Sequence, residues 1–238
     1  MILLYTDFGR NGPYVGEMHA VLAGLAPGVA IVDLMHDAPR YDPGAAGVYL
    51  ESLLDQLPRR CVIVAVVDPG VGSERRCVIA RAGERWLVGP DNGLFAPCLS
   101  VSDARAWEIP VPDDASASFH GRDVFAPAGA HLATGVMPRS AIPIDDWVGR
   151  EYEPERQRVI YVDAFGNCAT GIKATSLGAH PGVRVAGRSV PFARTFSAVE
   201  RGEPFWYVNS AGLVEVAINQ GSAADALGIG VGTGVTLT

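Results

Sequence analysis

Three glycine-containing segments of this 238-residue chain carry charged side chains of the kinds that bind polar ligands or take part in catalysis. The segment FHGRDVFAPAGAHLA, which begins at Phe119, brings a histidine, an arginine and an aspartate together within four residues. Asp7 lies in YTDFGRNGPYVG and Asp68 lies in VVDPGVGSERR, each at the end of an apolar run. Because open α/β sheets bind ligands at the carboxyl ends of their strands, this placement predicts a functional site built from these segments.

Each of these residues also has a structural interpretation, which is the more common one for a residue of its type. An isolated aspartate such as Asp7 is usually a turn former or a helix cap. A lone histidine in a polar loop, such as His120, is usually exposed or hydrogen bonded. Arg122 and Asp123 can pair at the start of a helix that Gly135 ends. These interpretations leave unexplained why so many polar residues gather at the strand ends of one domain.

Several familiar motifs are excluded by their surroundings. DFG near the start is not a protein-kinase motif, because no glycine-rich loop, VAIK strand or HRD loop accompanies it. GVGSER lacks the third glycine of a dinucleotide fingerprint and leads into a hairpin pattern, CVIARAGERWLVG, where a helix would be needed to bind a diphosphate. His120 and His131 have no metal-ligand spacing, and Asp91 in GPDNGLF is expected to be structural. We therefore expect no metal site.

The first 150 residues alternate short apolar runs with helical patterns. The runs ILLYT, AIVDLM and CVIVAVV are separated by helices predicted over about 13–24 and 43–57, the second with Asp42 as its cap. Apolar runs of this kind belong to a parallel sheet that is buried on both faces under its crossover helices. The sequence therefore predicts an α/β fold, with an N-terminal domain over residues 1–150 that contains a mainly parallel sheet flanked by helices.

The pattern changes after REYEPERQR, a charged, proline-containing segment that is expected to be a linker. The rest of the chain reads as strands and turns: RVIYVDAFGNCATGI, VRVAGRSVPFARTF, PFWYVNSAGLVEVAIN and GVTLT. We therefore predict a smaller, all-β domain over residues 158–238.

Composition and charge argue against several classes of protein. No segment approaches the roughly 20 apolar residues that span a bilayer, and Met1 leads into an apolar run without a basic leader, so we expect a soluble, cytoplasmic protein without a membrane partner. The net charge of −7 and the lack of a Lys/Arg cluster argue against a nucleic-acid partner. The four cysteines have no C-x-x-C pair and are expected to be buried core residues: Cys61, Cys77, Cys98 and Cys168.

Six blocks, in this order, resemble the S-adenosylmethionine (SAM) hydroxide adenosyltransferases, also called SAM hydrolases, which are relatives of the bacterial fluorinase and chlorinase. The blocks are TDFG…YVGEM, VDPGVGSERR, VGPDNGLF, FHGRDVFAPAGAHLA, VDAFGNCATGI and NSAGLVEVAINQGSAADALGI. They cover nearly the whole chain, from Tyr5 to about Gly228. The resemblance implies an enzyme without a cofactor that cleaves its substrate SAM with water at C5′, giving adenosine and L-methionine. It also implies a homotrimer, with each site between the N-terminal domain of one subunit and the C-terminal domain of its neighbour.

The resemblance implies catalytic roles for Asp68, Arg75 and His120, which match the set that activates water in this family. Asp68 is the expected proton acceptor, with His120 sharing or relaying the proton. Arg75 would fix the carboxylate by a charge-assisted hydrogen bond, which would also weaken it as a base. The division of labour between Asp68 and His120 stays open at this point, and Arg76 is the competing choice for the arginine.

Binding roles follow from the same resemblance. Asp7 matches the aspartate that accepts hydrogen bonds from both ribose hydroxyls. Asp163, Asn167 and Ser210 match residues that contact the methionine part of SAM. The fluorinase has an arginine after that serine where this chain has Ala211, so other donors must bind the carboxylate here. Backbone groups near INQG are expected to hold the adenine.

Two alternative functions remain. The first is a 5′-halogenase, but the fluorinase carries Tyr-Ser where this chain has His120-Gly121, and it lacks the aspartate that stands here at Asp68. A carboxylate would repel a halide in a dry site, so Asp68 and His120 favour water as the nucleophile. The second is a non-catalytic protein that binds SAM or adenosine, because a fold does not fix a function.

Overall fold

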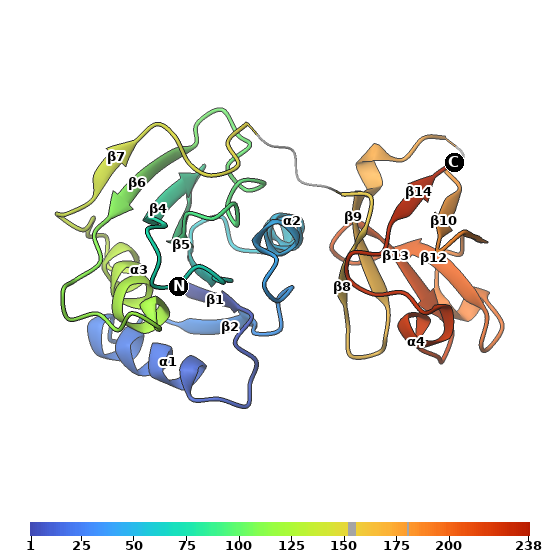
Figure 1. The fold of residues 1–238 in the computed structure, drawn as a ribbon, viewed down its shortest axis with the longest axis horizontal. Coiled ribbons are helices and arrows are strands. Elements are labelled where there is room, and N and C mark those ends of the chain that lie inside the picture. The colour runs from blue at the N-terminus through green and yellow to red at the C-terminus, as the bar shows by residue number, and fades with distance from the viewer. Residues whose placement is uncertain (152–155, 180) are drawn as a thin grey trace. The chain divides into compact units, whose positions relative to one another are not determined.

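The computed structural model describes residues 1–151, 156–179 and 181–238, and the chain divides into two compact units (Figure 1). The N-terminal unit comprises residues 1–50 and 57–153, and the C-terminal unit comprises residues 51–56 and 154–238. Each unit has its own cluster of buried hydrophobic side chains. The expected linker, REYEPERQR, lies partly outside the described residues.

A seven-stranded sheet with the order β2-β1-β3-β5-β4-β6-β7 forms the centre of the N-terminal unit. Its strands are β1 (Ile2–Thr6), β2 (Ile31–Met35), β3 (Val62–Val66), β4 (Cys77–Ala82), β5 (Arg85–Pro90), β6 (Arg105–Ile109) and β7 (Ile142–Ile144). β2, β1, β3 and β5 run parallel, whereas the pairs β5/β4, β4/β6 and β6/β7 are antiparallel. The expected α/β class is confirmed. The sheet becomes antiparallel at the β4–β5 hairpin because a tight turn reverses the chain.

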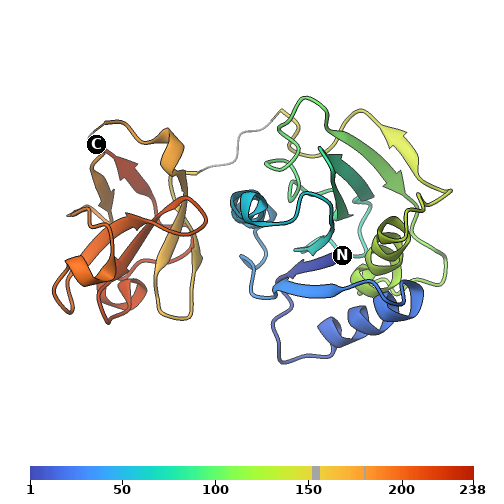
Figure 2. The same ribbon diagram turned by 180° about the vertical axis from the view of Figure 1, so that it is seen from behind.

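Helices cover both faces of this sheet. The helices are α1 (Tyr14–Leu25), α2 (Pro43–Leu53) and α3 (Ala126–Ala133). α1 and α3 lie side by side (Figure 1 and Figure 2), and their buried side chains pack with those of Ile2 and Leu4. Tyr5 points to the opposite face, because side chains alternate along a strand, and its hydroxyl donates to the carbonyl of Ala46 in α2 at 2.8 Å. α2 therefore covers the second face.

The helix boundaries follow the local signals in the sequence. Asp42 caps α2, since its Oδ1 accepts the backbone N–H of Ala45 at 2.9 Å, as predicted. α2 ends at Leu53 and continues as a 3₁₀ turn to Gln56. A π-helical turn over Gly121–Phe125 leads from His120 into α3. Gly135, with a φ of 82°, ends this helical segment as expected.

The C-terminal unit consists of two antiparallel sheets. The strands are β8 (Val159–Val162), β9 (Cys168–Lys173), β10 (Val183–Val185), β11 (Arg188–Val190), β12 (Pro204–Val208), β13 (Leu213–Ile218) and β14 (Val235–Leu237), in the orders β12-β13-β9-β8 and β11-β10-β14. Side chains from both sheets form one buried cluster. The unit also contains a short helix, α4 (Ala223–Leu227), which begins because Ser222 Oγ accepts the N–H of Asp225 at 3.1 Å.

The four cysteines are free thiols with at most 5% of their surface exposed, as predicted for core residues. Three of them belong to the N-terminal unit and Cys168 to the C-terminal unit. None of the helices in the described part of the chain is long and apolar enough to cross a membrane.

Candidate active site

The carboxyl ends of β1 and β3 lie side by side, and an aspartate follows each of them. Thr6 pairs with Val66 in the parallel register of the two strands. Asp7 follows Thr6, and its backbone N–H donates to the carbonyl of Val66 at 3.3 Å. Asp68 stands two residues beyond Val66. Both aspartates and His120 line one cavity of about 140 Å³, so the structure brings these three predicted residues together.

Asp68 and Arg75 form a nearly buried ion pair at this cavity. Arg75 Nε donates to Oδ1 and Oδ2 of Asp68 at 3.0 and 3.1 Å, and Nη2 donates to Oδ2 at 2.5 Å. Only 5% of the Asp68 side chain and 9% of the Arg75 side chain are exposed. The loop between them turns back at Gly72, whose φ is 79° and where a Cβ would lie 2.6 Å from the carbonyl oxygen of Ala117. Glycine is therefore required for this loop to close.

His120 joins this pair through its Nδ1 atom, which lies 2.8 Å from Arg75 Nη2. A guanidinium group can only donate, so Nδ1 is the acceptor and the proton of the neutral ring is on Nε2. His120 is 5% exposed, and both its burial and the charge of Arg75 lower its pKa from the usual value. The imidazole is therefore neutral at pH 7, with Nε2–H as a hydrogen-bond donor.

Two further side chains fix the guanidinium group of Arg75. Its Nη1 donates to the Sγ atom of Cys77 at 2.9 Å, and its Cζ lies 5.4 Å from the centre of the Phe125 ring. Burial raises the pKa of the Cys77 thiol, so the thiol is protonated at neutral pH. The sequence interpretation gave Cys77 only a core role. The available signal was its spacing of two residues from Arg75, because alternation in extended chain turns such residues to the same side.

Arg76 turns away from Asp68. It pairs with Asp91 at 2.7 Å and with Asp146 at 3.0 Å, and the other oxygen of Asp91 accepts the N–H of Val148 at 2.8 Å. Asp91 is thus structural, as expected. Of the two neighbouring arginines, Arg75 is the one that contacts Asp68.

Arg122 and Asp123 follow His120 in the sequence but pair with each other, as their structural interpretation predicted. Arg122 Nε lies 2.7 Å from Asp123 Oδ1, and Nη1 lies 2.6 Å from an oxygen of Glu17 in α1. Asp123 Oδ2 also accepts the backbone N–H of Ser116 at 2.9 Å. These bonds connect the π-helical turn to α1 and to the preceding loop.

Aromatic side chains surround Asp7 in the cavity. Phe8, Tyr41 and Phe119 line it, and the rings of Phe8 and Phe119 meet edge to face at 5.7 Å. Burial raises the pKa of Asp7, while hydrogen bonding from the Tyr41 backbone N–H and the charge of Arg40 act in the opposite direction. The sequence interpretation did not select these aromatic residues. Phe8 and Phe119 could have been found because each adjoins a predicted site residue.

In the C-terminal unit, Asp163 and Asn167 form a tight turn between β8 and β9. Asp163 Oδ1 accepts the backbone N–H groups of Phe165 and Asn167 at 2.8 and 2.9 Å, and Oδ2 accepts from Asn167 Nδ2 at 2.9 Å. Asp163, Asn167 and residues 218–221 line a cavity of about 670 Å³. Residues 218–221 are the INQG segment that the sequence suggested for adenine.

Ser210 is exposed in the turn between β12 and β13, and it is not among the described residues that line this cavity. Asn209 shapes the turn, because its Oδ1 accepts the N–H groups of Ala211 and Leu213 at 3.0 Å each. Asn209 Nδ2 in turn donates to the buried carboxylate of Glu215 at 2.7 Å. The predicted methionine-binding residues thus lie in two separate turns of this unit.

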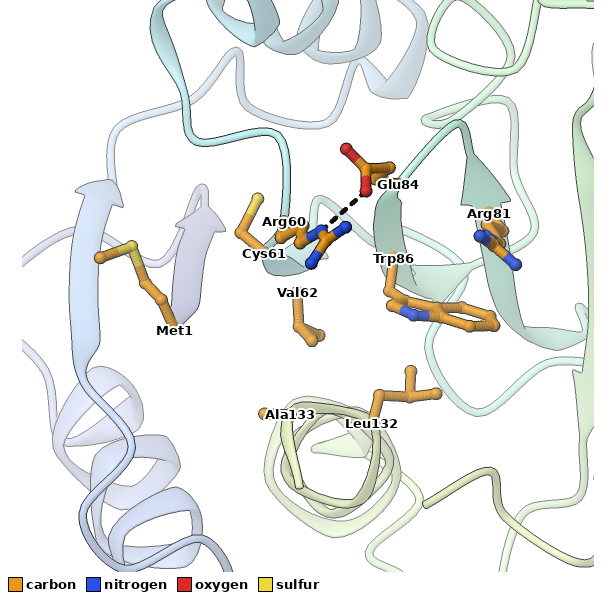
Figure 3. A pocket seen from close by; sticks show the side chains of 9 residues that line it. All are labelled: Met1, Arg60, Cys61, Val62, Arg81, Glu84, Trp86, Leu132 and Ala133. Carbon is orange, nitrogen blue, oxygen red and sulfur yellow. Dashed lines mark hydrogen bonds and ion pairs between the residues drawn. The ribbon is translucent and has the colours of Figure 1, made fainter. Parts of the chain in front are cut away.

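A third cavity, of about 390 Å³, lies at the amino ends of the parallel strands of the N-terminal sheet (Figure 3). Met1 and Cys61, which precede β1 and β3, line it together with Trp86 and an ion pair between Arg60 and Glu84. The Arg60 side chain is 86% exposed, so this pair is a surface feature. Ligands of open α/β sheets bind at the carboxyl ends of the strands, which favours the cavity of Asp68 as the functional one.

Comparison with known protein families gives a match for each unit. Residues 2–142 match the N-terminal domain of the SAM hydroxide adenosyltransferases, and residues 157–236 match their C-terminal domain. The chain is 42% identical over 255 residues to the (R)-S-adenosyl-L-methionine hydrolase of Thermus thermophilus, with 99% of this chain and 98% of that protein covered. It is 25% identical to the fluorinase of Actinoplanes sp., with 100% and 97% covered.

Two solved structures resemble the whole chain. One is an uncharacterized conserved protein from Thermotoga maritima, with a TM-score of 0.86, 29% identity, and coverage of 100% of this chain and 99% of that one. The other is a conserved hypothetical protein from Thermus thermophilus, with a TM-score of 0.79, 41% identity and the same coverage. The two-unit architecture is therefore shared with proteins of known structure.

Proposed function

The chain belongs to the SAM hydroxide adenosyltransferase family, and we propose that it hydrolyses S-adenosyl-L-methionine at C5′ to adenosine and L-methionine. The observation that carries this proposal is the Asp68–Arg75–His120 network, which lines the same cavity as Asp7. Relatives named as hydrolases are also more similar to this chain than relatives named as fluorinases.

The proposed reaction is an in-line displacement by water. The water oxygen forms a bond to C5′ while the C5′–S bond breaks, and the electron pair of that bond goes to sulfur. The sulfonium then departs as the neutral thioether of methionine and needs no acid. Water is a poor nucleophile, however, and transfer of its proton to a well-placed base accelerates such a step by about 10²–10⁴-fold.

We assign Asp68 as the acceptor of this proton. His120 Nδ1 already accepts a hydrogen bond from Arg75, so the ring has its proton on Nε2 and cannot accept a second one there. We assign Nε2–H as a donor to the attacking oxygen, which would orient a water lone pair toward C5′. Arg75 holds both groups at once and so fixes the distance between base and donor.

Asp7 is proposed to accept hydrogen bonds from the two ribose hydroxyls, since a carboxylate offers two acceptor oxygens. The cavity of about 140 Å³ around it is smaller than the lower limit of about 300 Å³ for typical small-molecule sites, so it does not enclose a whole SAM molecule. We propose that a neighbouring subunit of a trimer supplies the remainder through Asp163, Asn167 and Ser210. Asp163 keeps one unused lone pair for the substrate ammonium group, because a carboxylate has about four acceptor positions and three of them are occupied.

Sedimentation at micromolar concentration tests the proposed assembly. A trimer is the expected species. A monomer that still turns over SAM would contradict the shared site while leaving the hydrolysis itself in place.

Hydrolysis at C5′ is tested by incubation with SAM in ¹⁸O-labelled water, followed by mass spectrometry of the products. The expected result is one ¹⁸O atom in the 5′-oxygen of adenosine and none in methionine. Adenosine without the label would refute the proposed function. No adenosine at all would also refute it and would favour a non-catalytic binding protein.

The halogenase alternative is disfavoured by two features of the cavity. The Asp68 carboxylate repels an anion. At Gly121, where the fluorinase carries a serine, the chain has no hydroxyl, and a Cβ atom would lie 3.0 Å from Phe119 Cε2 and 3.3 Å from Phe8 Cζ. A serine at this position would therefore require the two rings to shift by a few tenths of an ångström.

A further inference from the structure

A buried histidine outside the proposed catalytic set is connected to the strand end that carries Asp7. His36 follows β2 and is only 2% exposed. Its Nδ1 lies 2.8 Å from the hydroxyl oxygen of Thr6, the last residue of β1. The same oxygen accepts the backbone N–H of Phe8 at 3.3 Å. The Thr6 hydroxyl therefore connects His36 to the backbone of Phe8, the residue that follows Asp7.

Backbone hydrogen bonds hold the same turn to its two neighbouring strands. Gly9 N–H donates to the carbonyl of His36 at 2.6 Å, and Asp7 N–H donates to the carbonyl of Val66 at 3.3 Å. The N–H of Phe8, between them, is bonded to the Thr6 hydroxyl. Loss of that hydroxyl would thus release the middle of the turn that presents the Asp7 carboxylate.

Asp33 lies on the other side of the His36 ring. A backbone N–H can only donate, so Phe8 occupies one lone pair of the Thr6 hydroxyl, and the bond to His36 Nδ1 uses either the hydroxyl proton or the second lone pair. His36 Nε2 lies 3.1 Å from an oxygen of Asp33 but off the line of a good hydrogen bond. His19 Nε2 lies 2.6 Å from the same oxygen. Partial burial raises the pKa of Asp33, but the hydrogen bond from His19 and the proximity of the His36 ring outweigh it and lower the pKa overall, so the carboxylate is ionised.

We propose that Thr6 and His36 are positioning residues for ribose recognition, because they hold the Asp7 turn in its binding geometry before the substrate arrives. The inference rests on the proposed function, in which Asp7 binds the ribose hydroxyls. A carboxylate on a loose turn would have to be ordered during binding, and that ordering opposes affinity. If His36 were merely a satisfied core histidine, its loss would lower stability without changing which ligands bind.

The test compares Thr6→Val, which removes the hydroxyl and keeps the β-branched shape, with Thr6→Ser, which keeps the hydroxyl. Dissociation constants are measured by calorimetry for adenosine and for 2′,3′-dideoxyadenosine, which lacks both hydroxyls that Asp7 would bind. Thr6→Val is expected to weaken adenosine about 5- to 30-fold, a range typical of one lost buried interaction, and to change the dideoxynucleoside less than twofold. Thr6→Ser should bind both nucleosides about as the wild type does.

His36→Gln provides a second variant in case Thr6→Val does not fold, because it removes the polar atom at the Nδ1 position, and His131→Gln is the matched control. His131 lies exposed on α3, away from the turn. His36→Gln should reproduce the adenosine-selective loss, whereas His131→Gln should not. Variants that bind both nucleosides with equal losses, or with none, would refute the inference while SAM hydrolysis by the wild type still stands. A wild type that neither binds adenosine nor hydrolyses SAM would refute the proposed function, and this inference with it.

Discussion

Replacing Asp68 by asparagine tests the proposed base directly, because the change removes the proton-accepting charge and keeps the side-chain shape. An amide oxygen at the Oδ2 position can still accept from Nη2 and Nε of Arg75, which lie 2.5 and 3.1 Å away. The arginine therefore keeps its hydrogen bonds, while the loss of its counter-charge should lower the melting temperature. Loss of general-base assistance should lower kcat by about 10²–10⁴-fold, equivalent to about 3–5 kcal/mol of transition-state stabilisation. KM should change little, because the base acts only in the transition state.

The assay is release of adenosine at saturating SAM, measured by chromatography, with sedimentation and thermal melting to show that assembly and fold are intact. Asp91→Asn is a matched control, since the Asp91 side chain is also 5% exposed and also pairs with an arginine, but lies away from the cavity. Asp91→Asn should lower the melting temperature and leave kcat unchanged. If Asp68→Asn kept a kcat within about threefold of the wild type, with the fold and assembly intact, the assignment of Asp68 as the base would be wrong.

Three further results are expected. Asp7→Ala should raise KM much more than it lowers kcat, since ribose contacts are made in both ground and transition states; steady-state kinetics showing the reverse would remove Asp7 from substrate binding. Burial and the charge of Arg75 lower the pKa of His120, so kcat/KM should be flat from about pH 7 to 8 and fall only below about pH 6.5. The fall is expected because the protonated ring can no longer accept the hydrogen bond from Arg75, and the His120→Gln variant should not show it. With excess fluoride or chloride, the wild type and Gly121→Ser should both give adenosine and no 5′-halogenated nucleoside in mass spectra; a halogenated main product would reverse the choice of nucleophile.

Local signals in the sequence were sufficient for much of the fold. The cap at Asp42, the β4–β5 hairpin and the helix end at Gly135 depend on residues a few positions apart, and all three are found as predicted. The short helix α4 was missed although Ser222 and Asp225 form a capping pair, because a helix of five residues has almost no periodic pattern.

The candidate site shows a different limit. The sequence predicted which residues follow the carboxyl ends of the parallel strands, so Asp7 and Asp68 were expected to be neighbours. The choice between Arg75 and Arg76 could not be made from spacing, because it depends on which side chain faces the strand end. The contact of Thr6 with His36 joins neighbouring strands across 30 residues of sequence, and it became visible only when the register of β1 and β2 was known.

The shared use of Arg75 by Asp68 and His120 constrains how such a site can evolve. Loss of Asp68 alone would leave a guanidinium group buried without a counter-charge, and breaking a buried pair in this way typically costs about 3–5 kcal/mol. The total stability of natural proteins is only about 5–15 kcal/mol. A lineage that changes its nucleophile from water to halide therefore has to replace Asp68 and Arg75 together, or first gain stability elsewhere. Intermediates in which only one of these two residues is replaced should be rare.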